Sequence, residues 1–185
     1  MNIDAAGRAK TSATCKAPSG APRKGFALML LLALLLAVSP AGAADKAPLK
    51  PGPQDKCPVC GMPVAGFPNW VSTVTFKDGS HAFFDGPKDM FKYLLDLKRY
   101  NPSKQPGDIE AVWVTDYYKV APIDGRKAWY VSGSDVNGPM GEELVPFGKE
   151  SDAKAFSKDH KGKKILTFDA VRLETLSVPE GHGVH

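Results

Sequence analysis

Three sulfur-bearing side chains, those of Cys57, Cys60 and Met62, fall within six consecutive residues of a chain that has only one other cysteine, Cys15. Thiolate and thioether sulfur together favour Cu(I) over harder metal ions. Gly61 separates two of the three sulfur residues and gives the backbone the freedom to turn both side chains toward one ion. The spacing therefore predicts a copper site.

The C-x-x-C spacing of Cys57 and Cys60 also fits a small disulfide or a redox-active dithiol. A disulfide across so short a loop stabilises a domain little. A redox dithiol needs no thioether and usually opens a helix, whereas Pro63 follows Met62 directly here. We favour metal binding and keep a thiol-disulfide oxidoreductase as the alternative; for Met62 alone, packing in the core is the competing interpretation.

Tetrahedral zinc usually requires four Cys or His ligands at matching spacing. The sequence has neither a second C-x-x-C nor an H-x-x-x-H pattern, so it offers no such set.

Met140 is a second candidate ligand because it lies between Pro139 and Gly141, in a segment typical of a turn. A hydrophobic side chain on a turn has little core to enter, so contact with a ligand or partner and ordinary loop packing are both open.

The four histidines are weaker candidates, and we expect none of them to be a primary ligand. His81 falls on a predicted hairpin, and His160 falls near a helix end, where a cation complements the helix dipole. His182 and His185 fall in a C-terminal tail marked by Pro and Gly, where they could form an auxiliary copper site.

Residues 1–43 are predicted to be a signal peptide. Arg23 and Lys24 precede 13 consecutive apolar residues, 26–38, a run shorter than the roughly 20 residues of a bilayer-spanning helix. The small residues 41–43 (AGA) then offer a cleavage site. An uncleaved membrane anchor is the alternative, and both interpretations place the folded part outside the cytoplasm.

Cleavage after residue 43 would leave 142 residues, enough for one domain with a core of its own. The whole chain has 24 Lys and Arg and 20 Asp and Glu; five of the basic and one of the acidic residues precede residue 44, so 19 of each sign remain. Such a balance argues against a nucleic-acid-binding protein, which needs an excess of positive charge.

Alternating residues at 70–76 and an apolar run at 81–84 flank Asp78-Gly79, which predicts a hairpin. A two-residue loop would place His81 opposite Phe76. Asp85 then predicts the N-cap of a helix that ends near Asn101-Pro102.

The remaining pattern predicts an α+β fold, with two similar ββα-type units in tandem and mixed or antiparallel sheets. Ser151 is the predicted cap of a second helix, which ends near Gly162. The predicted strands are 109–114, 129–131, 142–147 and 164–168, and the predicted organisation is a solvated linker at 44–56, a domain at 57–175 with halves at about 57–105 and 106–175, and a flexible tail at 176–185.

In their order and spacing, several motifs together resemble the nitrous oxide reductase accessory protein family, NosL. They are Cys60-Gly61-Met62, Asp78-Gly79 with the following Phe83-Phe84-Asp85, the strand end at 130–134, Gly138-Pro139-Met140-Gly141, Leu144-Val145-Pro146-Phe147 before a helix with Ala153, Ala155 and Phe156, and Leu166-Thr167-Phe168-Asp169.

The resemblance implies a periplasmic Cu(I) carrier, not an enzyme, that helps to supply copper for the catalytic copper site of nitrous oxide reductase and receives it from a membrane-bound complex. It implies Cys60 and Met62 as ligands and Met140 as a third or neighbouring one. Cys57, three residues before Cys60, is available as an extra thiolate. A soft-metal carrier for a different client is the alternative. A site that releases its cargo should leave its sulfur atoms at least partly exposed.

The chain departs from the family pattern at two places. Typical members carry a lipid-bearing cysteine after the leader, where this chain has Ala43-Ala44. Cys57 is not universal in the motif, and it could either supplement the copper site or close a disulfide with Cys60 that would abolish binding.

Overall fold

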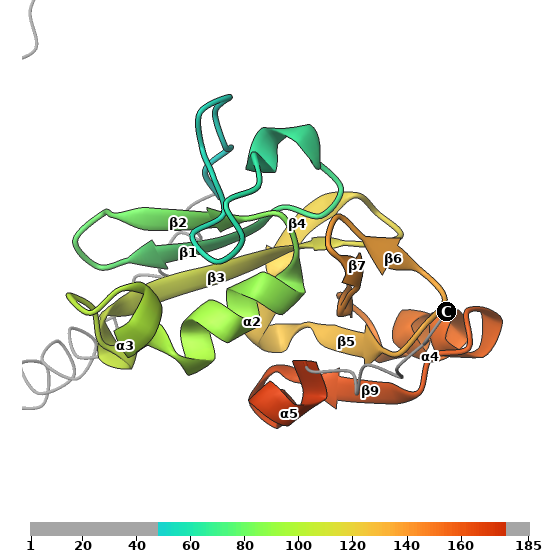
Figure 1. Cartoon of the computed structure of the whole chain (residues 1–185). Coiled ribbons are helices and arrows are strands. Elements are labelled where there is room, and N and C mark those ends of the chain that lie inside the picture. The colour runs from blue at the N-terminus through green and yellow to red at the C-terminus, as the bar shows by residue number, and fades with distance from the viewer. Residues whose placement is uncertain (1–47, 177–185) are drawn as a thin grey trace, which may run out of the picture. The chain divides into compact units, whose positions relative to one another are not determined.

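The computed structural model describes residues 48–176, and the predicted signal peptide at 1–43, Cys15, His182 and His185 lie outside that range. Within it, the chain builds two antiparallel sheets and a short two-stranded ladder around two longer helices (Figure 1). No helix in this range is long and apolar enough to cross a membrane. The predicted α+β class is confirmed.

The first sheet has the strand order β2-β1-β3-β4, and every pairing in it is antiparallel. Apolar side chains from its strands, among them Val74, Phe84 and Val112, are buried together with Met90 and Phe91 of the helix α2. The strands are β1 (Ser72–Phe76), β2 (His81–Phe84), β3 (Ile109–Asp116) and β4 (Ala121–Asp124).

The hairpin between β1 and β2 forms as predicted, but its predicted register is wrong by one residue. His81 pairs with Thr75 rather than with Phe76, and the Phe76 N–H donates to the Ser80 carbonyl at 2.8 Å. The loop has three residues and ends at Gly79, whose φ of 85° suits the left-handed position of such a loop. His81 packs against Phe83, two residues further along the same face of β2, with ring centroids 4.9 Å apart.

The helix α2 (Pro87–Leu95) begins with proline at its first position, where no N–H is required, and its N-cap is Gly86. The prediction that Asp85 caps this helix is therefore wrong, because the Asp85 side chain is buried and accepts a hydrogen bond from a cysteine instead. The single helix predicted to end near Asn101-Pro102 is divided at Asp96, where α2 ends. A short helix α3 (Leu97–Tyr100) follows, and its C-cap, Asn101, lies where the predicted helix was expected to end.

The second sheet has the order β8-β5-β9, again antiparallel, and α4 (Glu150–Asp159) covers it. Phe156 of α4 is buried against Val131 and Phe147. The N-cap of α4 is Lys149, so the predicted cap, Ser151, lies inside the helix. The strands are β5 (Trp129–Ser132), β8 (Val145–Phe147) and β9 (Lys164–Thr167).

The predicted strand at 142–147 is interrupted, because Glu143 and Leu144 separate β7 (Gly141–Glu142) from β8. β7 pairs with β6 (Asn137–Gly138) and forms the short ladder whose turn carries Met140. The other short elements are η1 (Val64–Gly66), η2 (Pro106–Asp108), η3 (Gly125–Lys127), η4 (Phe168–Ala170) and α5 (Leu173–Leu176).

The first sheet has four strands and the second has three, and a helix packs against each of them, but the sheets do not divide at residue 105. β3, which falls in the predicted second half, pairs with β1 of the first. In the predicted linker, Lys56 pairs with Pro63, and Leu176, the first residue of the predicted tail, is buried at the end of α5. The tandem relation and the predicted boundaries stay predictions.

Tyr130 of β5 joins the second sheet to the first core. Its buried ring packs edge-on against Phe91 of α2, with centroids 4.9 Å apart, and its hydroxyl donates to the Gly125 carbonyl at 2.6 Å. In Figure 1, α2 accordingly lies between the first sheet and β5.

We expect Tyr130→Phe to lower the free energy of unfolding by about 1 kcal/mol, because it removes the shorter of two hydrogen bonds to the buried Gly125 carbonyl, which also accepts from the Ala128 N–H at 3.4 Å. Urea unfolding of the two proteins measures the change. Tyr118→Phe is the matched control, since Tyr118 is 48% exposed, and we expect a change within about 0.5 kcal/mol there. Equal effects of the two substitutions would contradict this assignment.

Candidate metal centre

A tight turn brings the two cysteines of the domain to the same side of the backbone. The Cys57 N–H donates to the Met62 carbonyl at 2.9 Å, and the Gly61 N–H donates to the Cys57 carbonyl at 2.8 Å. Gly61 has a φ of 79°, a conformation that side-chain-bearing residues rarely adopt. Gly61 was predicted to give the motif a flexible backbone. In the structure it adopts the positive φ that closes this turn.

Two carboxylates face the two thiols across the turn. The Cys60 thiol donates to Oδ1 of Asp85 at 3.3 Å, and the Cys57 thiol donates to Oδ2 of Asp89 at 3.6 Å. One ligand atom from each of the four residues lies within 4.8 Å of all the others, a grouping that could hold a metal ion. We call these four residues, Cys57, Cys60, Asp85 and Asp89, the thiol-carboxylate cluster.

Burial raises the pKa of the Cys57 thiol to about 11, and neighbouring backbone N–H groups offset only part of that rise. Burial is also the main cause of the raised pKa of Cys60, and Asp89 and Asp85 add to it. The Cys57 thiol donates its hydrogen bond to Asp89, whereas the carboxylate that helps to raise its pKa is that of Asp85. Both carboxylates are therefore close enough to influence the pair of thiols. Both thiols are consequently protonated near neutral pH in the metal-free protein.

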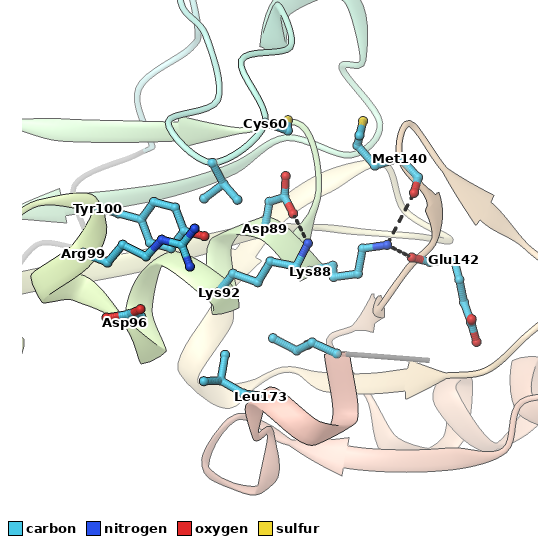
Figure 2. A pocket seen from close by; sticks show the side chains of 12 residues that line it. Cys60, Lys88, Asp89, Lys92, Asp96, Arg99, Tyr100, Met140, Glu142 and Leu173 are labelled. Atoms are coloured by element: carbon cyan, nitrogen blue, oxygen red, sulfur yellow. Dashed lines mark hydrogen bonds and ion pairs between the residues drawn. The ribbon is translucent and has the colours of Figure 1, made fainter. Parts of the chain in front are cut away.

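Cys60 and Met140 line the same pocket, which has a volume of about 800 Å³. Figure 2 shows the pocket with Asp89 beside Cys60 and with Met140 on the adjoining loop. Met140 is 47% exposed and Cys60 is half-buried, whereas Cys57 is only 2% exposed. Of the predicted ligands, the structure therefore places one thiol and one thioether on an open surface and one thiol behind them.

Lys88 of α2 holds the loop that carries Met140. Its Nζ donates to the Met140 carbonyl at 3.4 Å and to the Glu142 carbonyl, as the dashed lines in Figure 2 show. The loop is thus attached to the same helix that supplies Asp89.

Met62 is half-buried and is not among the residues that line the pocket. Its backbone N–H bonds to the Cys60 side chain and partly offsets the raised pKa of that thiol. Whether its thioether binds the same ion as Cys60 stays a prediction.

The two histidines within residues 48–176 lie apart from the cluster. His81 packs against Phe83, and His160 stacks on Phe156 and bonds through Nδ1 to Asp135 at 3.1 Å.

Sequence reasoning missed both carboxylates, since it assigned Asp85 to a helix cap and gave Asp89 no role. The available signal was the presence of two carboxylates within five residues of the predicted helix start. In the structure Asp85 precedes α2 and Asp89 lies in its first turn.

Glu143, which the sequence analysis also missed, ties the Met140 loop to the start of α2. Its Oε1 accepts hydrogen bonds from the backbone N–H of Lys88 at 2.5 Å and of Leu144 at 2.9 Å. The residue is 4% exposed, and burial raises the pKa of its carboxyl to about 7.

Comparison with known proteins gives one consistent result. A family model described as NosL matches residues 48–176. Over 174 residues, covering 84% of this chain and 87% of the relative, the sequence is 31% identical to a protein from Stutzerimonas stutzeri named copper-binding lipoprotein NosL. The structure matches the copper chaperone NosL from Shewanella denitrificans with a TM-score of 0.60 and 27% identity, covering 70% of this chain and 98% of that one.

The raised pKa of Glu143 should make stability depend on pH. Between about pH 4.5 and 7 the unfolded chain loses this proton while the folded protein keeps it, so the free energy of unfolding falls as the pH rises, by up to about 3 kcal/mol, and then levels. Glu143→Gln keeps an oxygen acceptor for both N–H groups and should flatten this part of the profile.

Urea unfolding at several pH values measures both profiles, and Glu142→Gln controls for the loss of one negative charge in the same strand region. A Glu143→Gln profile that parallels the wild type would show that the carboxyl titrates normally.

Proposed function

Since this chain belongs to the NosL family, we propose that it is an exported Cu(I)-binding metallochaperone with no catalytic turnover of its own. The observation that carries the proposal is the shared pocket of Cys60 and Met140, with Cys57 next to Cys60 in the thiol-carboxylate cluster. The relatives named as a copper-binding lipoprotein and a copper chaperone support it.

The proposed Cu(I) ligands are Cys60, Met62 and Met140, with Cys57 as an additional thiolate. Sulfur donors suit Cu(I) because both are soft, and a thioether binds without losing a proton. A thiolate ligand must first be deprotonated, so each cysteine that binds copper releases a proton to solvent.

A carrier has to hand its ion to another protein, which requires access. Cys60 and Met140 both border an open pocket, so ligands of a second protein could reach the ion before Cys60 and Met140 release it. The half-exposed state of these two residues supports transfer by ligand exchange.

We further propose that the client is the apo-protein of nitrous oxide reductase and that a membrane-bound complex supplies the copper, as the family resemblance implies. The same resemblance and the predicted leader at residues 1–43 support a periplasmic location. Association with the membrane through an uncleaved leader is the alternative to a free periplasmic domain.

The pKa values of the two thiols argue against the alternative function, that of a thiol-disulfide oxidoreductase. The nucleophile of such an enzyme is a thiolate of lowered pKa. Burial raises the pKa of Cys57 to about 11 and raises that of Cys60 as well, which is the opposite of what that chemistry needs.

An anaerobic Cu(I) titration against a chromogenic competitor tests the copper proposal. We expect one Cu(I) per chain, a loss of affinity of about 100-fold or more for Cys60→Ser, and of about tenfold for Met140→Leu and Met62→Leu, because each removes a soft ligand. Met90→Leu is the matched control, since Met90 is a methionine buried in the first core.

Cys57→Ser in the same titration measures whether the buried thiol binds the ion or only lies near it. Wild-type affinity in both Cys60→Ser and Met140→Leu would refute the proposed site. In that case, a reduction potential of the C-x-x-C pair close to those of known dithiol catalysts would favour the oxidoreductase.

A further inference from the structure

We propose that the thiol-carboxylate cluster is also a divalent-cation site, which binds Zn²⁺ through all four of its residues, Cys57, Cys60, Asp85 and Asp89. This goes beyond the proposed copper function, which needs the sulfur atoms and neither carboxylate.

The donor types and their number fit zinc. Zinc takes cysteine sulfur at about 2.3 Å and carboxylate oxygen at about 2.0 to 2.2 Å, usually with four ligands in a tetrahedron. The sequence has no further Cys or His at motif spacing, so the cysteine pair alone does not predict a zinc site. The structure supplies the missing pair from the start of α2 as carboxylates.

The separations within the cluster also fit. A tetrahedron with those bond lengths puts a sulfur ligand and an oxygen ligand about 3.6 Å apart. The two sulfur-oxygen pairs that bond here lie at 3.3 Å, between Cys60 and Asp85, and at 3.6 Å, between Cys57 and Asp89. Since all four ligand atoms lie within 4.8 Å of one another, an ion would need only small side-chain movements to engage them.

One oxygen in the cluster gives an independent sign of a missing ligand. Oδ2 of Asp85 is buried and has no hydrogen-bond partner, and the residue as a whole is 1% exposed. A buried polar atom without a partner costs free energy that a bound cation would recover.

The charges of the bound state favour a dication. Two thiolates and two carboxylates carry four negative charges, of which Zn²⁺ offsets two and Cu(I) only one. Lys92 offsets one more, since its Nζ pairs with Oδ1 of Asp89 at 2.9 Å and leaves Oδ2 facing Cys57. Binding releases the two thiol protons to solvent and involves no redox change.

An ion can reach the cluster from the pocket, because Cys60 and Asp89 are both part of its wall. Zn²⁺ bound there would occupy both thiols, so we expect Zn²⁺ and Cu(I) to compete for the protein.

Anaerobic titration of the reduced protein with Co²⁺, followed by displacement with Zn²⁺, tests the inference. We expect one Co²⁺ per chain, with the visible bands of a tetrahedral ion and a thiolate-to-metal charge-transfer band, and loss of both on addition of Zn²⁺. Asp85→Asn and Asp89→Asn should each weaken Co²⁺ and Zn²⁺ binding by about tenfold or more, a larger loss than either causes for Cu(I).

Asp96→Asn is the matched control, because Asp96 lines the same pocket outside the cluster, and it should bind both divalent ions as the wild type does. Met140→Leu should weaken Cu(I) binding without changing Zn²⁺ binding, which separates the two sites. If both carboxylate variants bind as the wild type does, or if Co²⁺ gives only octahedral bands, the divalent site is refuted. In that case, a wild-type protein that still binds Cu(I) would support the copper carrier. Conversely, a wild-type protein that binds tetrahedral Co²⁺ but no Cu(I) would refute the carrier and leave the divalent site standing.

Discussion

The structure around the candidate site depends on the contact between a tight turn and the start of a helix. Cys57 and Cys60 donate to Asp89 and Asp85, and the turn that presents the thiols closes through Gly61. Because these groups are buried together, each thiol keeps its proton and each carboxylate gains a donor. The same contact that stabilises the metal-free fold thus places four metal-ligand atoms within reach of one ion.

Two residues of the β7-β8 region and α2 extend this arrangement to Met140. Lys88 donates to the backbone on both sides of Gly141, and Glu143 accepts the N–H of Lys88. Tyr130 then packs against Phe91 of the same helix. The thioether comes from the short ladder and the thiols from the segment before the first sheet, and α2 is the element that contacts both. The proposed copper ligands therefore come from both predicted halves.

The sequence was enough to predict the α+β class and both longer helices, because hydrophobic periodicity is a local signal. The ligand set of Cys60, Met62 and Met140 stays a prediction, and of these three residues Cys60 and Met140 line one pocket. The sequence was not enough for the role of Asp85, since a helix cap and a buried acceptor look alike until tertiary contacts are known. Glu143 was likewise assigned to a strand, because the sequence does not show that its side chain accepts hydrogen bonds from the backbone of Lys88 and Leu144. The hairpin register failed because Asp78-Gly79 fits two-residue and three-residue loops, and only the Phe76 and Ser80 backbone bond decides between them.

The two thiols differ in their exposure to solvent, so an ion or oxidant that enters from solvent contacts them in a fixed order. Cys60 and Asp89 stand on the pocket wall, whereas Cys57 lies behind it with 2% of its surface accessible. An arriving ion or oxidant therefore meets the outer sulfur first and engages the inner one only after the first contact has formed. If one ion binds both sulfur atoms, as proposed, its departure reverses this order, so the bond to the inner thiol breaks first and the last bond to break is one that a second protein could reach.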